Sequence, residues 1–107
     1  MPAPRIGFVF LPERPIGELP RVAREADERG FDELWLWEDC FLAGGIAASA
    51  TALASSSSIA VGLGIMPAVF RNVAATAMEL ATLANLYPGR FLPGLGHGLP
   101  RWMEQVG

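Results

Sequence analysis

Apolar and polar positions along this chain fall into a repeating order, in which a short apolar run precedes a segment with helical spacing. Residues 5–10 (RIGFVF) are rich in β-branched and aromatic side chains, which predicts a strand. Apolar residues then recur every three or four positions over residues 19–26, with Pro20 near the start and Gly30 as the stop signal. The first repeat is therefore predicted to be a strand followed by an amphipathic helix.

The same order recurs three more times along the chain. Further strands are predicted at residues 33–37, 59–66 and 90–96, and further helices at residues 43–53, from residue 73 and from residue 100. Asn72 is the expected N-cap of the third helix. The apolar face of that helix is predicted to comprise Val73, Ala77, Leu80 and Ala84. Strands that alternate with helices predict an α/β fold, with a parallel sheet covered by helices and right-handed crossovers.

The sequence favours part of a barrel over a doubly wound sheet. Residues 10–15 (FLPERP) follow the first strand, where a dinucleotide-binding fold carries a Gly-x-Gly-x-x-Gly turn. Residues 94–98 (GLGHG) lack the third glycine at the required spacing. A complete (β/α)8 barrel has about 250 residues. Residues 1–107 are therefore predicted to form a single partial domain of four βα units, about half of such a barrel.

Composition and charge exclude several classes of protein. The net charge of −3, from 8 basic and 11 acidic side chains, gives no basic stripe for nucleic acid. The single cysteine, Cys40, cannot form an intramolecular disulfide and fits a cytoplasmic protein. Residues 40–70 carry no charge, but they are mostly small and include four serines at 55–58, so no membrane span is predicted. The first fifteen residues do not have the pattern of a signal peptide.

The stretch VGLGIMPAVFRN, residues 61–72, begins with the pattern of a strand, which glycines and a proline then interrupt. Gly62 and Gly64 alternate, so an extended chain presents both to the same face. Pro67 then removes a backbone donor. Two interpretations stay open at this point: a flat group approaches the backbone there, or the glycines serve tight packing within the sheet.

Several segments together resemble the bacterial luciferase-like superfamily, in the branch of FMN-dependent monooxygenases and deazaflavin-dependent reductases. The run RIGFVFLPERPIGELPRVAREADERGFDELWLWED is similar to the first βαβ unit of that superfamily. VGLGIMPAVFRN, AMELATLANLYPGRFLPGLGHG and PRWMEQVG are similar to the following units. The resemblance implies a (β/α)8 barrel with a flavin or deazaflavin at the carboxyl ends of the strands, of which this chain resembles the N-terminal half only.

The resemblance also assigns candidate coenzyme contacts. It implies a non-prolyl cis peptide at Gly64–Ile65 that bulges toward the coenzyme ring, and a coenzyme contact at Asp39. Cys40 stands where many deazaflavin members carry histidine, and a thiol with an ordinary pKa does not replace imidazole as a proton carrier. Gly96 lies at the end of the fourth strand, next to the coenzyme region. For Asp39 and Cys40, a helix-capping carboxylate and a packed small hydrophobe remain the alternatives.

The candidate catalytic residues are Glu13, Asp39 and His97. Glu13 matches a carboxylate that faces substrate in some members, with a surface loop charge as the alternative. His97, between two glycines, can hydrogen-bond a flavin edge or donate a proton, with a structural role as the alternative. Leu99 occupies the place of a glutamate that serves some members as the acid. No cluster has the spacing of metal ligands.

The resemblance implies an oxidoreductase that acts on a small-molecule substrate. A deazaflavin coenzyme, the first choice, implies hydride transfer, whereas FMN implies monooxygenation. A homodimer is expected, because the family is commonly dimeric. The competing hypothesis is a non-catalytic half-barrel that dimerises through its open strand edges. Neither hypothesis involves nucleic acid or a membrane.

Overall fold

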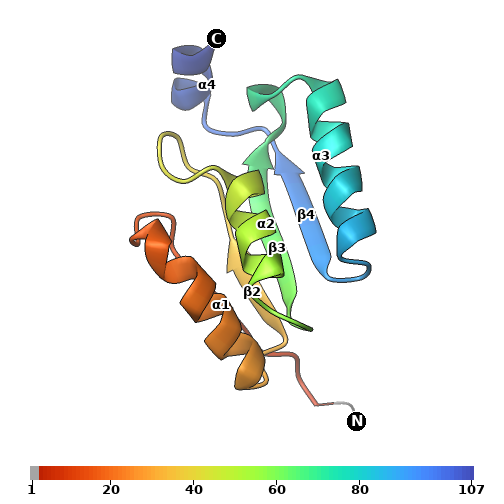
Figure 1. Ribbon diagram of the computed structural model, residues 1–107. Coiled ribbons are helices and arrows are strands. Elements are labelled where there is room, and N and C mark those ends of the chain that lie inside the picture. The colour runs from red at the N-terminus through yellow and green to blue at the C-terminus, as the bar shows by residue number, and fades with distance from the viewer. Residues whose placement is uncertain (1–2) are drawn as a thin grey trace.

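The computed structural model describes residues 3–107, and it contains one parallel sheet of four strands (Figure 1). The strands are β1 (Gly7–Val9), β2 (Glu33–Leu36), β3 (Ala60–Pro67) and β4 (Phe91–Gly96), and they lie in chain order across the sheet. The predicted α/β class is thereby confirmed. Residues 1 and 2 of the predicted domain lie outside the described residues.

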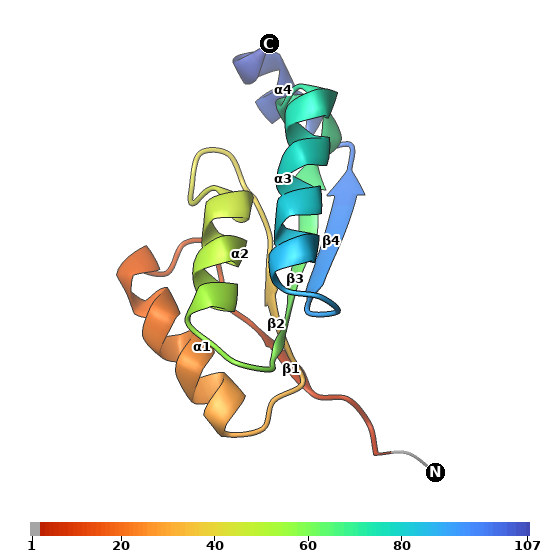
Figure 2. The same ribbon diagram turned by 45° about the vertical axis from the view of Figure 1, so that its right-hand side comes forward.

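One helix follows each strand. The helices are α1 (Leu19–Glu28), α2 (Gly45–Ala54), α3 (Val73–Leu86) and α4 (Pro100–Val106), with short 3-10 turns η1 (Ile16–Glu18) and η2 (Ala68–Phe70). Helices α1, α2 and α3 lie on one side of the sheet, whose other side they leave open (Figure 2). The predicted boundaries agree to within two or three residues. The two 3-10 turns were not predicted, because a single turn shows no repeating period.

Local signals set the helix boundaries. Helix α1 is followed by Gly30, whose φ of +83° is a conformation that glycine adopts readily. Helix α3 begins after Asn72, whose side-chain oxygen accepts the N–H of Ala74 at 2.8 Å. That bond satisfies one of the free amides of the first helical turn, so the predicted N-cap is confirmed.

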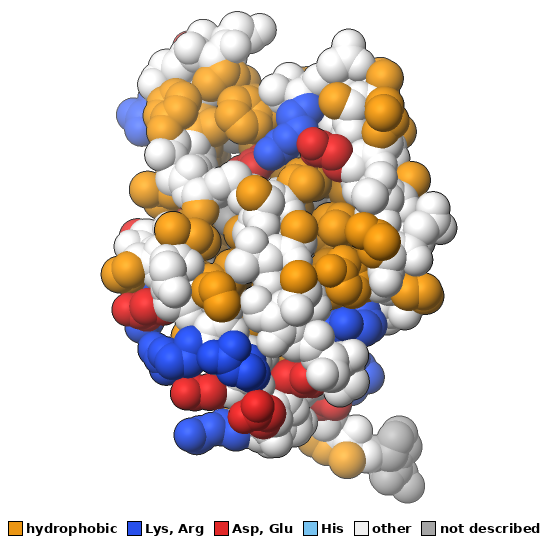
Figure 3. All heavy atoms as spheres, in the orientation of Figure 1, with side chains coloured by type: hydrophobic (Ala, Val, Ile, Leu, Met, Phe, Trp, Pro, Cys, Tyr) orange, Lys and Arg blue, Asp and Glu red, His pale blue; other side chains and the backbone are white. Residues whose placement is uncertain are grey.

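The hydrophobic core lies between the sheet and its covering helices. Strand residues such as Leu34, Val61 and Leu63 are fully buried against Leu19 of α1 and Leu53 of α2. Hydrophobic side chains are also visible on the outer helical face around α2 and α3, whereas charged side chains gather around α1 (Figure 3). Within residues 3–107, no helix is both long and apolar enough to cross a bilayer.

The predicted apolar face of α3 is correct only at Leu80, which packs against the core, whereas Ala77 and Ala84 are exposed. Thr76 and Leu83 are the buried residues of this helix, whereas Val73 is 81% exposed. The helix packs mainly on β4 and, within residues 3–107, has no helical neighbour on its far side, so only the narrow stripe toward β4 is covered. An alanine-rich helix of this kind has apolar residues all round, and periodicity alone does not identify the stripe.

The open face of the sheet carries an aromatic plate over a glycine. Trp35 of β2 lies opposite Gly62 of β3 in the parallel register, and a Cβ added to Gly62 would overlap the indole ring. The indole N–H of Trp35 donates to Glu33 Oε1 at 3.1 Å, which fixes the ring direction. Gly62 therefore serves close packing within the sheet, the second of the two interpretations that the glycine pattern left open.

Candidate functional site

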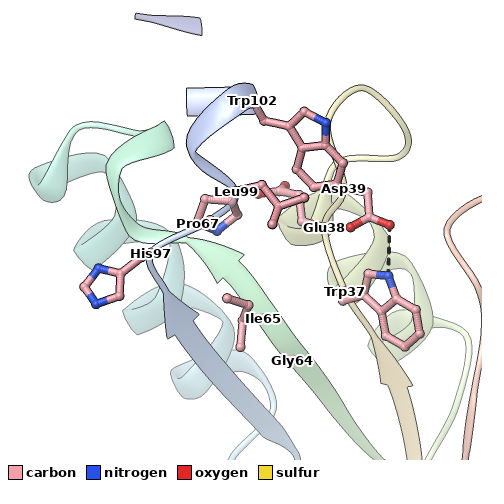
Figure 4. A pocket seen from close by; sticks show the side chains of 10 residues that line it. Trp37, Glu38, Asp39, Gly64, Ile65, Pro67, His97, Leu99 and Trp102 are labelled. Atoms are coloured by element: carbon pink, nitrogen blue, oxygen red, sulfur yellow. Dashed lines mark hydrogen bonds between the residues drawn. The ribbon is translucent and has the colours of Figure 1, made fainter. Parts of the chain in front are cut away.

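A pocket of about 430 Å³ opens at the carboxyl ends of β2, β3 and β4 (Figure 4). Its wall is largely apolar, and the residues that form it include Trp37, Asp39, Ile65, Pro67, Leu99 and Trp102. Segments from three strands and α4 contribute to this wall, so the pocket exists only because the parallel strands end at one edge. This is the end of the sheet at which βα folds place their functional groups.

Asp39 contributes a carboxylate to this pocket. It lies just beyond β2, and the indole N–H of Trp37 donates to its Oδ2 at 3.1 Å. Figure 4 shows Trp102 on the other side of the same carboxylate. The hydrogen bond from Trp37 therefore fixes the direction of this carboxylate, while the side chain remains half-exposed. The structure places this predicted site residue in the pocket.

The backbone of Gly64 and the side chain of Ile65 form the pocket wall that β3 contributes. The Gly64–Ile65 peptide bond is cis, as the resemblance implies, and so is Cys40–Phe41. Ile65 is 41% exposed. A Cβ on Gly96 would overlap the Ile65 side chain, so this glycine makes room for Ile65 rather than lining the pocket itself.

The remaining predicted residues are spread around this end of the sheet. His97 lies at the pocket rim, and its ring is directed away from Asp39 (Figure 4). Cys40 lines an adjoining pocket of about 240 Å³ together with Phe41 and Phe70. Glu13 is exposed in the turn after β1 and lines neither of these two pockets. The structure therefore brings Asp39, Gly64 and Ile65 together and leaves Glu13 and Cys40 outside that group.

The sequence interpretation missed Glu38, the most deeply buried acid of the site. Glu38 is 5% exposed, and its carboxylate forms a two-point ion pair with Arg71, with Nη1–Oε1 at 2.8 Å and Nη2–Oε2 at 2.5 Å. The alternation Leu34, Leu36, Glu38 places this acid on the buried side of β2. That pattern was the available signal, because a charge in a buried register needs a partner.

Hydrogen bonds keep both members of this pair charged. Burial by itself raises the pKa of Glu38, but the hydrogen bonds from Arg71 and from the Gly45 amide hold that pKa below its usual value. The hydrogen bonds to Glu38 in turn raise the pKa of Arg71 above its usual value. Among the residues that the structure describes, no group of three or more His, Cys, Asp or Glu side chains is arranged to hold a metal ion.

Comparison with known proteins identifies what this arrangement is similar to. The family model described as luciferase-like monooxygenase matches residues 5–107. A 5,10-methylenetetrahydromethanopterin reductase of Methanolobus tindarius is 30% identical over 102 residues, which cover 94% of this chain and 31% of the reductase. The chain thus spans less than a third of the length of that relative.

Solved structures show the same fold. The coenzyme F420 dependent tetrahydromethanopterin reductase of Methanopyrus kandleri superposes with a TM-score of 0.81 at 24% identity, over 96% of this chain and 30% of that one. The oxygenating constituent of 3,6-diketocamphane monooxygenase of Pseudomonas putida, solved with FMN, superposes with a TM-score of 0.86 at 20% identity, over 98% of this chain and 33% of that one. The four βα units therefore correspond to about a third of each of these TIM-barrel enzymes.

Proposed function

The chain belongs to the luciferase-like monooxygenase family, and from this premise we propose that it contributes the coenzyme-binding part of an oxidoreductase that uses a deazaflavin or FMN. The observation that carries the proposal is the pocket at the carboxyl ends of β2 to β4, where the Gly64 backbone and the Ile65 side chain are both exposed. An apolar pocket of several hundred Å³ with few polar groups is the usual form of a site for a small organic ligand.

The residues present suit a planar heterocycle. Ile65, Pro67 and Leu99 offer apolar surface, and the Asp39 carboxylate offers a fixed hydrogen-bond acceptor beside two indole rings. When bound, a deazaflavin supplies hydride transfer and FMN supplies oxygen activation. We favour the deazaflavin, because the relative with 30% identity is a reductase and the similar solved reductase is described as coenzyme F420 dependent.

The roles proposed for the chain's own residues follow from where they lie. Asp39 accepts a hydrogen bond from the coenzyme, and Ile65 with Gly64 supports its ring. His97 at the rim is the candidate proton donor to substrate, once its ring turns inward. Glu13, in the turn after β1, is a contact for a small-molecule substrate that extends over β1. Cys40 and Gly96 act less directly, through the adjoining pocket and through Ile65.

A second candidate function is a non-catalytic half-barrel that pairs with another copy. Strands β1 and β4 each have an unpaired edge within residues 3–107, and Val9 and Leu95 are 44% and 52% exposed there. Two copies related by a twofold axis could join β1 of one to β4 of the other in parallel. Sedimentation at several concentrations tests this proposal, and a concentration-independent monomer would contradict it. The cytoplasm stays our proposal for its location.

The test of the coenzyme proposal is a fluorescence titration of the 107-residue chain with coenzyme F420 and, separately, with FMN. Saturable binding is expected, and Asp39→Asn should weaken it about tenfold or more, because a hydrogen bond to a charged group is worth about 1.5–3 kcal/mol.

Asp32→Asn is the matched control for this titration. It removes a charge from an acid that binds the Ile6 amide at the opposite end of the sheet, so coenzyme affinity should stay unchanged. If the unsubstituted chain binds neither coenzyme, the proposal fails for this chain.

A further inference from the structure

Glu38 is a buried carboxylate in the wall of the pocket proposed for the coenzyme. It lies beside Asp39 and lines both the 430 Å³ pocket and the adjoining 240 Å³ pocket. Removing a carboxylate from water is strongly unfavourable unless it is paired and hydrogen-bonded. A charged Glu38 is therefore stable at this buried position only because of its hydrogen-bond and ion-pair partners.

Four segments of the chain meet at Glu38. Its backbone N–H donates to the carbonyl of Ile65 at 3.1 Å, and its Oε2 accepts the amide N–H of Gly45, the first residue of α2, at 2.6 Å. Arg71, from the segment between β3 and α3, completes the set with its two-point ion pair. One residue thereby joins the ends of β2 and β3 to the starts of α2 and α3.

Arg71 is itself held in one orientation. Its guanidinium lies 5.3 Å from the centre of the Phe70 ring, a cation–π distance, and Nη1 is 3.9 Å from the sulfur of Met66. Its side chain is only 21% exposed. The planar fork of Arg71 therefore meets the carboxylate with fixed geometry, unlike a mobile surface ion pair.

A buried ion pair is a poor means of raising stability, because apolar residues of similar volume often stabilise a fold equally well or better. What an ion pair adds is a fixed orientation of the segments that it connects. Here those segments carry the two groups of the proposed coenzyme site, since Asp39 is the next residue along the chain and the Ile65 carbonyl accepts the backbone N–H of Glu38. We propose that Glu38 and Arg71 are positioning residues, which fix the spacing between Asp39 and Ile65. The inference rests on the proposed function.

The double variant Glu38→Gln/Arg71→Met separates positioning from stability. It removes both charges together, so no unpaired charge is left buried, and the glutamine carbonyl can still accept the Gly45 amide. The matched control is Arg90→Met at the opposite end of the sheet. Arg90 is also half-buried, lies 5.5 Å from the Tyr87 ring and donates to the Ile59 carbonyl at 3.1 Å.

The first measurement is coenzyme affinity, by titration with F420 and with FMN. The double variant should retain its fold and bind about tenfold more weakly or worse, since a small displacement of site groups has effects of that size or larger. Arg90→Met should bind like the unsubstituted chain. A folded double variant with unchanged affinity would overturn the inference.

The second measurement needs no coenzyme and keeps the two proposals apart. Amide resonances in proton–nitrogen NMR spectra should broaden or split over residues 39–44 and 64–66 in the double variant, whereas Arg90→Met should change residues 55–59 instead. Single, sharp resonances over both loops of the double variant would overturn the inference even if the chain binds no coenzyme. Should the double variant fail to fold, Arg71→Lys keeps the charge, loses the fork and is expected to show the same loop broadening.

Discussion

The two ends of the sheet both use charged side chains to hold loops, but in different ways. At the amino end, Asp27 accepts the backbone amides of Ser57 at 2.7 Å and Ile59 at 2.9 Å, and Arg90 donates to the carbonyl of Ile59. At the carboxyl end, Glu38 and Arg71 pair mainly with each other. The amino end therefore stabilises one loop directly, whereas the carboxyl end joins several segments around a pocket.

The two ends thus leave different groups free for other interactions. The charged side chains at the amino end form hydrogen bonds with backbone groups of the turn before β3. Each such bond gives a partner to a backbone donor or acceptor that would otherwise have none. At the carboxyl end, the buried pair leaves Asp39 with a tryptophan partner and a face toward the pocket. In βα folds the carboxyl end generally carries the chemistry and the amino end the stability.

The largest expected effect comes from breaking the carboxyl-end pair on one side. Glu38→Ala should lower the free energy of unfolding by about 3–5 kcal/mol, because Arg71, whose side chain is only 21% exposed, is left without its partner. Urea denaturation followed by circular dichroism measures this loss. Arg21→Gln, which breaks the exposed pair with Glu25 at 3.5 Å, is the control and should cost at most about 0.5 kcal/mol. Equal losses in the two variants would remove the contrast between buried and exposed pairs.

A somewhat smaller effect is expected at the amino end. Asp27→Ala leaves the amides before β3 without their acceptor and should lower the free energy of unfolding by about 2–3 kcal/mol, without changing coenzyme affinity. The exposed neighbour Glu28→Ala is the control. A weakened coenzyme affinity in Asp27→Ala would contradict the expectation that the amino end affects stability and not coenzyme binding.

The pH dependence of the free energy of unfolding gives a second test of the contribution that Asp27 makes. Burial raises the pKa of Asp27, but the hydrogen bonds from Ser57, Ser58 and Ile59 outweigh it and lower the pKa below the ordinary value of 3.8. With a lowered folded-state pKa, the stabilisation is present above the unfolded-state value and is lost as pH falls through the folded-state value. Asp27→Ala should therefore lose less stability than the unsubstituted chain as pH falls below about 4. Parallel acid curves for the two proteins would contradict this assignment.

The smallest loss of stability is expected from substitutions in the middle of the sheet, between its two ends. Gly62→Ala places a methyl group against the indole of Trp35 and should cost about 1–3 kcal/mol by overpacking. Gly64→Ala meets the same ring at 3.2 Å and should cost less. A double-mutant cycle with Trp35→Leu measures the coupling, and purely additive losses would show that ring and glycine are independent.

The elements were predictable from sequence, because each rests on local signals. Short apolar runs rich in β-branched and aromatic residues predicted the strands, and Asn72 predicted the start of α3. The resemblance implied the cis bond at Gly64–Ile65. The position of Asp39 beside the pocket also followed from its place at the end of a parallel strand.

Contacts between distant residues were not predictable in the same way. Glu38 and Arg71 are 33 positions apart, and no single-chain periodicity links them. Only Leu80 of the buried side of α3 was predicted, because an alanine-rich helix has no strong polar side that identifies its buried side. The ring over Gly62 depends on the register between β2 and β3, which only the assembled sheet fixes.

The plate of Trp35 over Gly62 has a consequence for how this chain can vary over generations. A larger residue at Gly62 meets the indole, so it is tolerated only after Trp35 has been replaced by a smaller side chain. Loss of the indole first leaves a gap on the sheet that a side chain at Gly62 can then fill. Substitutions at the two positions are therefore expected to occur together among related sequences, with Trp35 replaced before Gly62.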